Sequence, residues 1–216
     1  MFTNRSDAGK KLANALAGFR DERPVILALP RGGVPVAAEI ARPWNAPLDL
    51  VLVRKIGVPG QKELAMGAVV DGASPIVVKN DEVIRAVGIS EREFQAVCDA
   101  ERAEIERRRR RYLGDRPPVD VAGRTVIVVD DGLATGATMR AALRATRMRK
   151  PLRLVLAVPV APADTLAELA GEVDDVVCIE TPDYFVSIGG HYADFRLVGD
   201  DEVTAALSAA NAATTR

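Results

Sequence analysis

Two adjacent carboxylates, Asp130 and Asp131, follow a continuous run of β-branched residues at positions 126–129. Such a run is typical of a parallel strand that is covered on both faces. A loop of small residues comes next, and a helical pattern begins at about Thr138. We therefore expect the two acids at the carboxyl end of a strand, where open α/β sheets bind ligands. Adjacent carboxylates at such a place can accept hydrogen bonds from two vicinal hydroxyl groups.

The loop after these acids has the composition of a phosphate site. Its residues are Ala134, Thr135, Gly136, Ala137 and Thr138. Free backbone N–H groups and the start of the following helix would hold a phosphate, and the two threonine hydroxyls add donors. The glycine lets the backbone approach a ligand closely. A ribose 5-phosphate fits this layout, with its diol on the acids and its phosphate on the loop.

A simpler interpretation is that the two acids only end a strand and cap a helix. A cap needs one acid, however, and does not need the Thr-Gly-Ala-Thr loop. The chain contains neither Gly-x-x-x-x-Gly-Lys-Ser/Thr nor Gly-x-Gly-x-x-Gly. Two other common kinds of nucleotide-binding loop are therefore excluded.

Cations follow two other expected strands. Arg31 stands in Pro-Arg-Gly-Gly at positions 30–33, after a short apolar run at 25–29, and Pro35 suits the first turn of a helix. Arg54 and Lys55 end the apolar run at 48–53. Guanidinium and loop N–H groups at the carboxyl edge of a sheet can cradle an anion. The alternatives are a plain turn with a surface arginine and a basic strand end in solvent.

The stretch Val-Val-Asp-Asp-Gly-Leu-Ala-Thr-Gly-Ala-Thr at 128–138 resembles the phosphoribosyl-diphosphate signature of the type I phosphoribosyltransferases. It is most similar to the adenine-type variant, because Ala134 stands where 6-oxopurine enzymes carry a general acid/base aspartate. Gly132 departs from the pattern, since most relatives have a larger apolar residue there. The resemblance extends over roughly residues 24–200 and includes the Arg-Gly pair at position 31 and the Arg-Lys pair at position 54.

The resemblance implies transfer of the 5-phosphoribosyl group from phosphoribosyl diphosphate to a nitrogenous base, with release of pyrophosphate. Asp130 and Asp131 would hold the ribose hydroxyls and reach the cofactor Mg²⁺ indirectly, through substrate or water. The loop at 134–138 would hold the 5-phosphate. Arg31, Gly32 and Lys55 would hold the pyrophosphate, and Gly33 and Arg54 are expected as further substrate-binding residues.

Two further segments are expected to act on the substrates. The Gly- and Pro-containing stretch at 56–64 indicates a mobile loop, and the family closes a flexible loop at this place. Its Lys62 and Glu63 are candidates for phosphate contact and proton handling. In the loop at 181–195, Tyr184 and Phe185 are predicted to stack on the base. Tyr192 fits either that role or an apolar cluster with Phe195, whereas the single histidine, His191, is interpreted as structural.

The predicted fold class is α/β: one domain over residues 1–216, with a five-stranded, mainly parallel sheet flanked by helices. Ser6 and Asp7 are expected to cap a first helix. Residues 74–120 are predicted to form a helical insertion that acts with the flexible loop as a lid or hood. In it, a Ser90–Glu93 capping box begins a long helix that ends near Leu113. The basic run at 107–111 is interpreted as a solvated, ion-paired face, with a basic ligand patch as the alternative.

The chain has 29 basic and 30 acidic residues, so no net field favours nucleic acid or membrane. Cys98 and Cys178 have no metal or redox spacing, and the polar N-terminus has no signal-peptide core. We therefore expect reduced thiols, a cytoplasmic location and small-molecule substrates, with a homodimer as a further expectation. Two other functions remain open: a non-catalytic phosphoribosyl-diphosphate sensor and a diphosphokinase. The acceptor base is not identified by the sequence.

Overall fold

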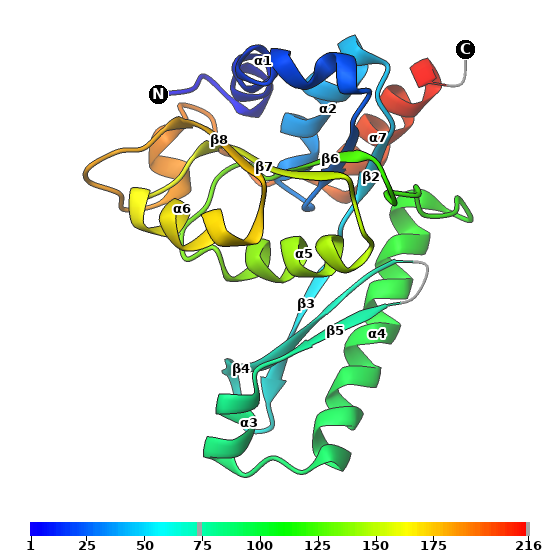
Figure 1. Ribbon diagram of the computed structural model, residues 1–216, viewed down its shortest axis with the longest axis vertical. Coiled ribbons are helices and arrows are strands. Elements are labelled where there is room, and N and C mark those ends of the chain that lie inside the picture. Colours follow the sequence, from blue (N-terminus) through cyan, green and yellow to red (C-terminus); the bar gives the residue numbers. More distant parts are fainter. Residues whose placement is uncertain (73–74, 215–216) are drawn as a thin grey trace.

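The computed structural model describes residues 1–72 and 75–214, and its main sheet has five parallel strands in the order β2-β1-β6-β7-β8 (Figure 1). The strands are β1 (Val25–Ala28), β2 (Leu48–Leu50), β6 (Thr125–Val129), β7 (Arg153–Val160) and β8 (Asp175–Glu180). Every residue of β1 and β6 is buried, as the continuous apolar runs predict. The expected α/β sheet is therefore confirmed, and all five of its strands are parallel.

Helices cover both faces of this sheet (Figure 1). The helices on one face are α1 (Arg5–Ala15), α2 (Gly33–Trp44) and α7 (Asp200–Thr214), and those on the other are α5 (Ala137–Met148) and α6 (Ala163–Leu169). Short 3-10 turns lie at η1 (Ala17–Glu22), η2 (Ala170–Glu172) and η3 (Ile188–His191). The strand residues alternate between the two layers: Ile26 and Ile127 pack with α2, whereas Leu27 and Val128 pack with α5. The chain proceeds from β1 towards one edge of the sheet and from β6 towards the other. The carboxyl ends of β1 and β6 are therefore the usual position of a ligand in an open sheet.

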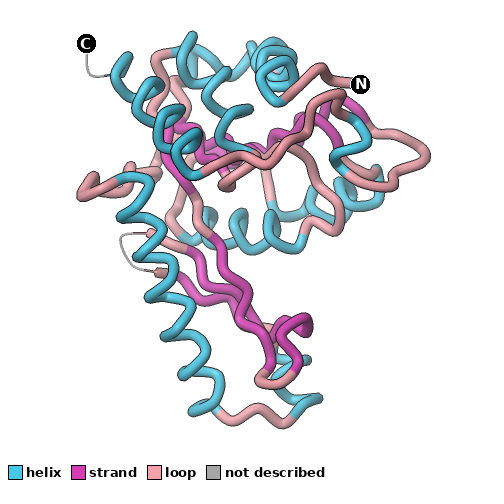
Figure 2. The backbone as a smooth tube through the Cα atoms, turned by 180° about the vertical axis from the view of Figure 1, so that it is seen from behind, coloured by secondary structure: helices cyan, strands magenta, loops and turns pink. Residues whose placement is uncertain are grey.

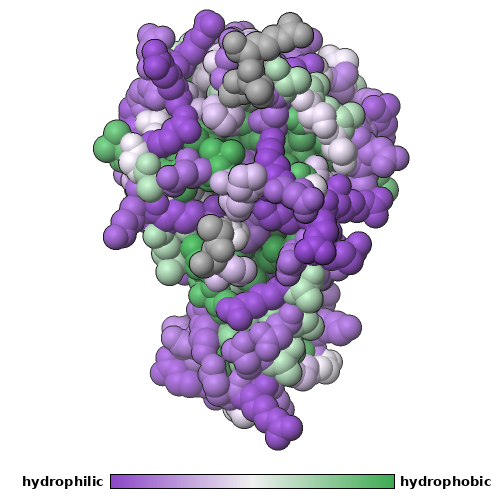
Figure 3. All heavy atoms as spheres, turned by 90° about the vertical axis from the view of Figure 1, so that its right-hand side faces the viewer, coloured by the Kyte–Doolittle hydropathy of each residue, from purple (hydrophilic) through white to green (hydrophobic). Residues whose placement is uncertain are grey.

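A second, antiparallel sheet leads away from the main sheet. It consists of β3 (Val53–Val58), β4 (Gln61–Val70) and β5 (Ile76–Lys79), followed by α3 (Asp81–Val87) and α4 (Glu91–Leu113). We call these five elements the extension. Figure 2 shows its strands lying along α4. In the space-filling view, apolar side chains are visible where the extension joins the main body (Figure 3).

Two sequence expectations about this region are wrong. The strand expected at 48–53 ends at Leu50, and β3 starts a new sheet at Val53. The segment expected as a mobile loop at 56–64 lies mostly in strands, with only Pro59 and Gly60 in the turn. The reason is tertiary: Ile56 and Val58 are buried in the same core cluster as Phe94 of α4, which local Gly and Pro signals do not show.

The helix starts are partly as predicted. Ser90 and Glu93 form the expected capping box at the start of α4, and α4 ends at Leu113. Helix α1 is capped by Asn4, whose side chain accepts from the Asp7 backbone N–H, so the expected Ser6 or Asp7 cap is wrong. Residue 74, the first of the expected insertion, lies outside the described residues. Within the described ranges, no helix has the length and apolarity that a bilayer crossing requires.

Candidate functional site

The two acids and the glycine loop are in direct contact at the neighbouring ends of β6 and β1. A Cβ atom added to Gly32 would overlap the Asp131 carboxylate. A Cβ atom on Gly33 would lie 2.7 Å from the Val129 carbonyl oxygen and 2.9 Å from the Asp130 Cα. Only glycine at both positions allows this approach. The fold therefore brings the predicted diol acids and the predicted pyrophosphate loop together.

The acid pair places two carboxyl groups close together. The Asp131 backbone N–H donates to Asp130 Oδ1 at 2.8 Å. Burial, together with the charge of Asp131, raises the pKa of the Asp130 carboxyl well above its ordinary value. The Asp131 carboxylate accepts a hydrogen bond from Arg5 Nε at 2.7 Å. Hydroxyl donors or a cation at this place would relieve the repulsion between the two carboxyl groups.

Arg5 is a site residue that the sequence did not reveal. It is the first residue of α1, a helix in which the sequence indicates only a cap at Ser6 or Asp7. Its guanidinium donates to the Arg196 carbonyl oxygen at 2.8 Å and stacks over Phe195, 3.9 Å from the ring centroid. These contacts hold the guanidinium against Asp131. No local sequence signal could have found it, because the two residues are 126 positions apart.

Tyr192 supports the acid pair through the backbone. Its hydroxyl donates to the Asp131 carbonyl oxygen at 2.6 Å. Burial, the largest cause, raises the pKa of Tyr192, so the hydroxyl stays a donor at neutral pH. Its ring packs against Phe2 and Phe195, with centroids 5.3 and 5.0 Å away. The apolar-cluster interpretation of Tyr192 and Phe195 is therefore confirmed.

The predicted phosphate loop leads into the N-terminus of α5. Gly136 has a φ of +69°, a conformation that favours glycine, and its Cβ would lie 2.9 Å from Thr165 Cγ2. The other four loop residues, at 134, 135, 137 and 138, are exposed. Exposed backbone at the start of a helix is suited to an anion. Gly132, which replaces the larger apolar residue of the family motif, has a steric cause: Ile188 Cγ2 would lie 2.6 Å from a Cβ at this position.

A cavity of about 490 Å³ brings five predicted residues together from β3, β4 and α5. They are Arg54, Lys55, Lys62, Glu63 and Thr138. Lys55 Nζ donates to Glu63 Oε2 at 3.0 Å, and Arg54 Nε donates to Glu101 Oε2 at 2.7 Å. Arg54 and Lys55 are thus paired with carboxylates, which an incoming phosphate would have to replace.

Arg31 does not line this cavity. The Pro30–Arg31 peptide bond is cis, and the Arg31 guanidinium is 3.8 Å from Asp200 Oδ1. Pro30 borders a smaller cavity of about 40 Å³, which Arg54, Arg108 and Thr138 also line. The glycine loop and the cations of β3 therefore adjoin each other through Pro30 and Arg54.

The predicted base-stacking residues do not line the cavities at the cations, although Phe185 packs in the same apolar cluster as Tyr192. Tyr184 is 84% exposed, and Phe185 stacks on His191 with ring centroids 5.5 Å apart. Neither residue lines the cavities described above. His191 Nδ1 is 3.6 Å from Glu180 Oε2, in keeping with its structural interpretation. The contact of Tyr184 and Phe185 with a base remains a prediction.

The acid pair suits Mg²⁺ more than a metal that needs a protein cage. Among the residues that the structure describes, no three His, Cys, Asp or Glu side chains form a candidate metal cluster. Two carboxylates at a phosphate loop match the way Mg²⁺ binds, through one or two acids plus substrate oxygens and water. Asp130 and Asp131 therefore fit an ion held mainly by its substrate.

Comparisons with known proteins give a consistent result. A family model described as the phosphoribosyl transferase domain matches residues 4–196. The Mycobacterium tuberculosis protein named "Putative phosphoribosyl transferase MT0597" is 44% identical over 211 residues, which are 98% of this chain and 47% of that protein. The chain thus spans about half the length of the curated relatives it matches. The crystal structure of TT1426 from Thermus thermophilus is 41% identical, with a TM-score of 0.83, and the match covers 96% of this chain and 97% of that one.

Proposed function

The chain belongs to the phosphoribosyl transferase domain family, and we propose that it moves the 5-phosphoribosyl group from phosphoribosyl diphosphate to a nitrogenous base, releasing pyrophosphate. One observation supports this proposal more strongly than the others. The glycine loop after β1 is packed so closely on Asp130 and Asp131 that a side chain at Gly32 would overlap the Asp131 carboxylate. A diol on the acids and a diphosphate on the loop would then be neighbours, as they are in phosphoribosyl diphosphate.

In this mechanism the residues orient the substrate and balance its charge. Asp130 and Asp131 accept hydrogen bonds from the two ribose hydroxyls. The loop at 134–138 holds the 5-phosphate with its backbone N–H groups and its threonine hydroxyls. These contacts fix the ribose at both ends, so that the bond from C1 to the diphosphate lies over the glycine loop.

The leaving group is stabilised at the other end of the site. When the C1–oxygen bond breaks, positive charge develops on the ribose ring and negative charge on the pyrophosphate, as in other glycosyl transfers. Arg31, Arg54 and Lys55, with the N–H groups of Gly32 and Gly33, offset the negative charge. Mg²⁺ held by Asp130 and Asp131 through substrate or water would add to that neutralisation. Lys62 and Glu63, on β4, contact phosphate and handle the proton of the acceptor.

A screen of purines, pyrimidines and pyridines tests the proposal directly. Each base is added to the protein with phosphoribosyl diphosphate and Mg²⁺, and pyrophosphate release is measured. At least one base should support release that depends on Asp130 and Asp131. Failure of every base, together with no binding of phosphoribosyl diphosphate, would contradict both the reaction and the substrate.

A second function, binding phosphoribosyl diphosphate without turnover, is favoured by the shape of the hairpin formed by β3 and β4. Its tip consists of Pro59 and Gly60, and Glu63 near the tip has a fully exposed side chain. So short a tip offers less cover against water than a long loop would. The same screen separates the two functions, because a sensor binds the ligand with Mg²⁺ and releases no pyrophosphate with any base.

A further inference from the structure

A cluster of charges on α4 and α7 lies beside the pyrophosphate loop. Asp200, the first residue of α7, accepts a hydrogen bond from the Tyr112 hydroxyl at 2.6 Å. Arg111 of α4 is 2.9 Å from the other oxygen of the same carboxylate. Arg31, from the glycine loop, is 3.8 Å from Asp200 Oδ1. One carboxylate therefore joins an arginine of the extension to an arginine of the proposed pyrophosphate site.

Arg108 brings a third guanidinium to this place. It lines the cavity of about 40 Å³ together with Pro30, Arg54 and Thr138. Its Nε donates to Glu104 Oε1 at 2.7 Å, so the guanidinium is held at one edge by its own helix. A cavity of this size has room for only a few water molecules or a small group. Its lining joins two predicted substrate-binding residues to one residue of α4.

The Asp200 carboxylate lies within the field of all three arginines. The Tyr112 hydroxyl, and then the charges of Arg111, Arg31 and Arg108, lower the pKa of Asp200. The carboxylate is thus ionised at neutral pH and is the negative partner of a positive cluster. Two of these guanidinium groups are within ion-pair distance of the carboxylate, and Arg108 lies close enough to affect its pKa. Clustered guanidinium groups are typical of sites for phosphate groups, which guanidinium binds through paired hydrogen bonds.

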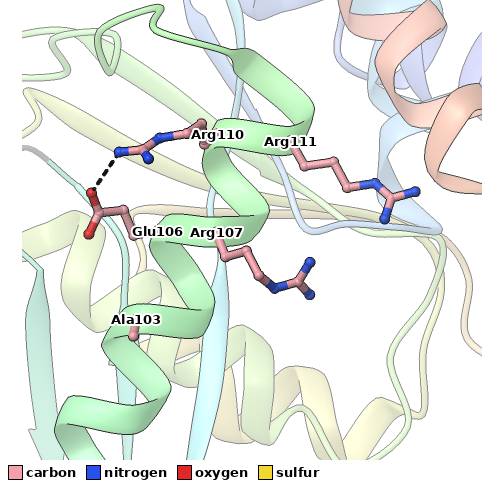
Figure 4. A pocket seen from close by; sticks show the side chains of 5 residues that line it. All are labelled: Ala103, Glu106, Arg107, Arg110 and Arg111. Carbon is pink, nitrogen blue, oxygen red and sulfur yellow. Dashed lines mark hydrogen bonds and ion pairs between the residues drawn. The ribbon is translucent and has the colours of Figure 1, made fainter.

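The basic run of α4 is divided between its faces (Figure 4). Arg107 and Arg111 point to one side of the helix, whereas Arg110 points to the other and pairs with Glu106 at 3.3 Å. Arg110 and Glu106 are both 73% exposed. Arg110 therefore provides a matched control for Arg108 and Arg111, with the same side chain on the same helix.

We propose that Arg108 and Arg111 of α4 complete the diphosphate site together with Arg31, and that Asp200 is an internal carboxylate which the diphosphate displaces. The inference rests on the proposed function, because it names further contacts of the same substrate. It assigns the extension a direct part in binding. Arg31 and Arg111 leave Asp200 when the diphosphate binds, and they then face the ligand together with Arg108, whose present partner is Glu104.

Isothermal titration calorimetry with pyrophosphate and Mg²⁺, and separately with ribose 5-phosphate, tests this assignment. Arg108→Gln and Arg111→Gln should each weaken pyrophosphate binding about tenfold, since a hydrogen bond to a charged group is lost. Neither change should alter ribose 5-phosphate binding, and Arg110→Gln should alter neither ligand. Asp200→Asn should strengthen pyrophosphate binding severalfold, because the competing charge is removed while an acceptor for Tyr112 remains.

The outcomes separate this inference from the proposed function. If the wild-type protein binds neither phosphoribosyl diphosphate nor pyrophosphate, the proposed function is wrong and the inference with it. If the wild type binds and the α4 variants bind equally well, only the inference is wrong. An equal loss of both ligands in folded variants would contradict it as well. Asp200→Asn tests the displacement independently, and unchanged or weaker pyrophosphate binding in that variant would contradict it.

Discussion

Two pairs of aspartates in this protein both lie against an arginine, but they differ in how many hydrogen-bond donors reach their oxygens. Asp49 and Asp71 lie where the extension joins the main sheet, and Arg109 of α4 donates to Asp71 at 2.6 Å and lies 3.3 Å from Asp49 Oδ2. Asp130 and Asp131 lie at the glycine loop, with Arg5 against Asp131. Each pair has an arginine from a distant helix against it, and Asp49 has a second arginine, Arg116, at 3.5 Å.

The pairs differ in how their oxygens are supplied with donors. Asp49 also accepts from the backbone N–H groups of Leu50 and Val119, both at 2.8 Å. Asp71 accepts from the Leu52 N–H at 2.7 Å. Within the described part of the chain, the carboxylate of Asp131 accepts from the Arg5 guanidinium, and that of Asp130 accepts from the adjacent backbone N–H.

Burial by itself does not separate a structural acid pair from a ligand site. It is the largest cause that raises the pKa of both Asp71 and Asp130. Filled acceptors indicate a junction that is complete within the protein, whereas acceptors with few donors next to a loop are open to a ligand. The first pair should therefore govern stability, and the second should govern binding.

The largest expected effect is the loss of stability on removing the structural pair. Asp71→Ala leaves Arg109, 14% exposed, without its closest partner, and breaking a buried ion pair costs about 3 kcal/mol or more. Urea denaturation should show this loss in the free energy of unfolding. The exposed pair Glu106–Arg110 is the control, since Glu106→Ala should cost less than about 1 kcal/mol. Similar losses in the two variants would remove the distinction between a buried junction and an exposed pair.

The second prediction concerns the ligand pair. Phosphoribosyl diphosphate with Mg²⁺ should raise the melting temperature of the wild type, because it binds only the folded state. The double change Asp130→Asn with Asp131→Asn should abolish that rise while the protein stays folded, since neutral amides bind the diol and the cation less well. Differential scanning fluorimetry measures both properties. An unchanged ligand-induced rise in the double variant would contradict the ribose assignment.

The third prediction is a pH dependence. Because the folded-state pKa of Asp130 is raised by burial and by Asp131, its contribution to stability is complete below the ordinary value of 3.8 and is lost as pH rises through the folded pKa. Asp130→Asn avoids that loss. The stability of the variant relative to the wild type should therefore increase from acid towards neutral pH, as measured by urea denaturation in a buffer series.

Glu93 provides a control of opposite sign. The Ser90 hydroxyl and backbone N–H lower the pKa of Glu93, so its contribution is present above the ordinary value of 4.5 and is lost as pH falls through the folded pKa. Glu93→Gln should therefore lose stability relative to the wild type as pH rises. If the relative stability of both variants changed with pH in the same direction, the pH dependence of Asp130→Asn would not arise from the burial of Asp130 and the charge of Asp131.

The smallest effect on stability is expected at Lys55. Its pair with Glu63 is open to solvent, so Lys55→Ala should change the free energy of unfolding by no more than about 0.5 kcal/mol. Turnover should nevertheless fall further than ribose 5-phosphate affinity, because that ligand has no pyrophosphate. Kinetic assays and calorimetry on the same preparation measure the two quantities. An equal fall in both would place Lys55 outside the pyrophosphate contacts.

Much of the ligand loop could be predicted from the sequence because its signals are local. The β-branched run, the two acids and the small-residue loop at 134–138 define a strand, a ligand loop and a helix without reference to distant residues. The same holds for the glycine loop at 30–33. The hairpin at 56–64 could not be predicted, because its glycines and proline resemble a loop until α4 covers its apolar residues.

The sequence by itself determined which chemical groups the protein presents: paired acids, a phosphate-type loop, a glycine loop with Arg31, and cations at 54 and 55. The tertiary structure decided which groups meet. It placed Arg5 on Asp131, Arg109 between Asp49 and Asp71, and Asp200 among the arginines of α4 and the glycine loop. The physical reason is that strand, loop and helix signals depend on adjacent residues, whereas charge pairing across helices depends on how separate elements pack.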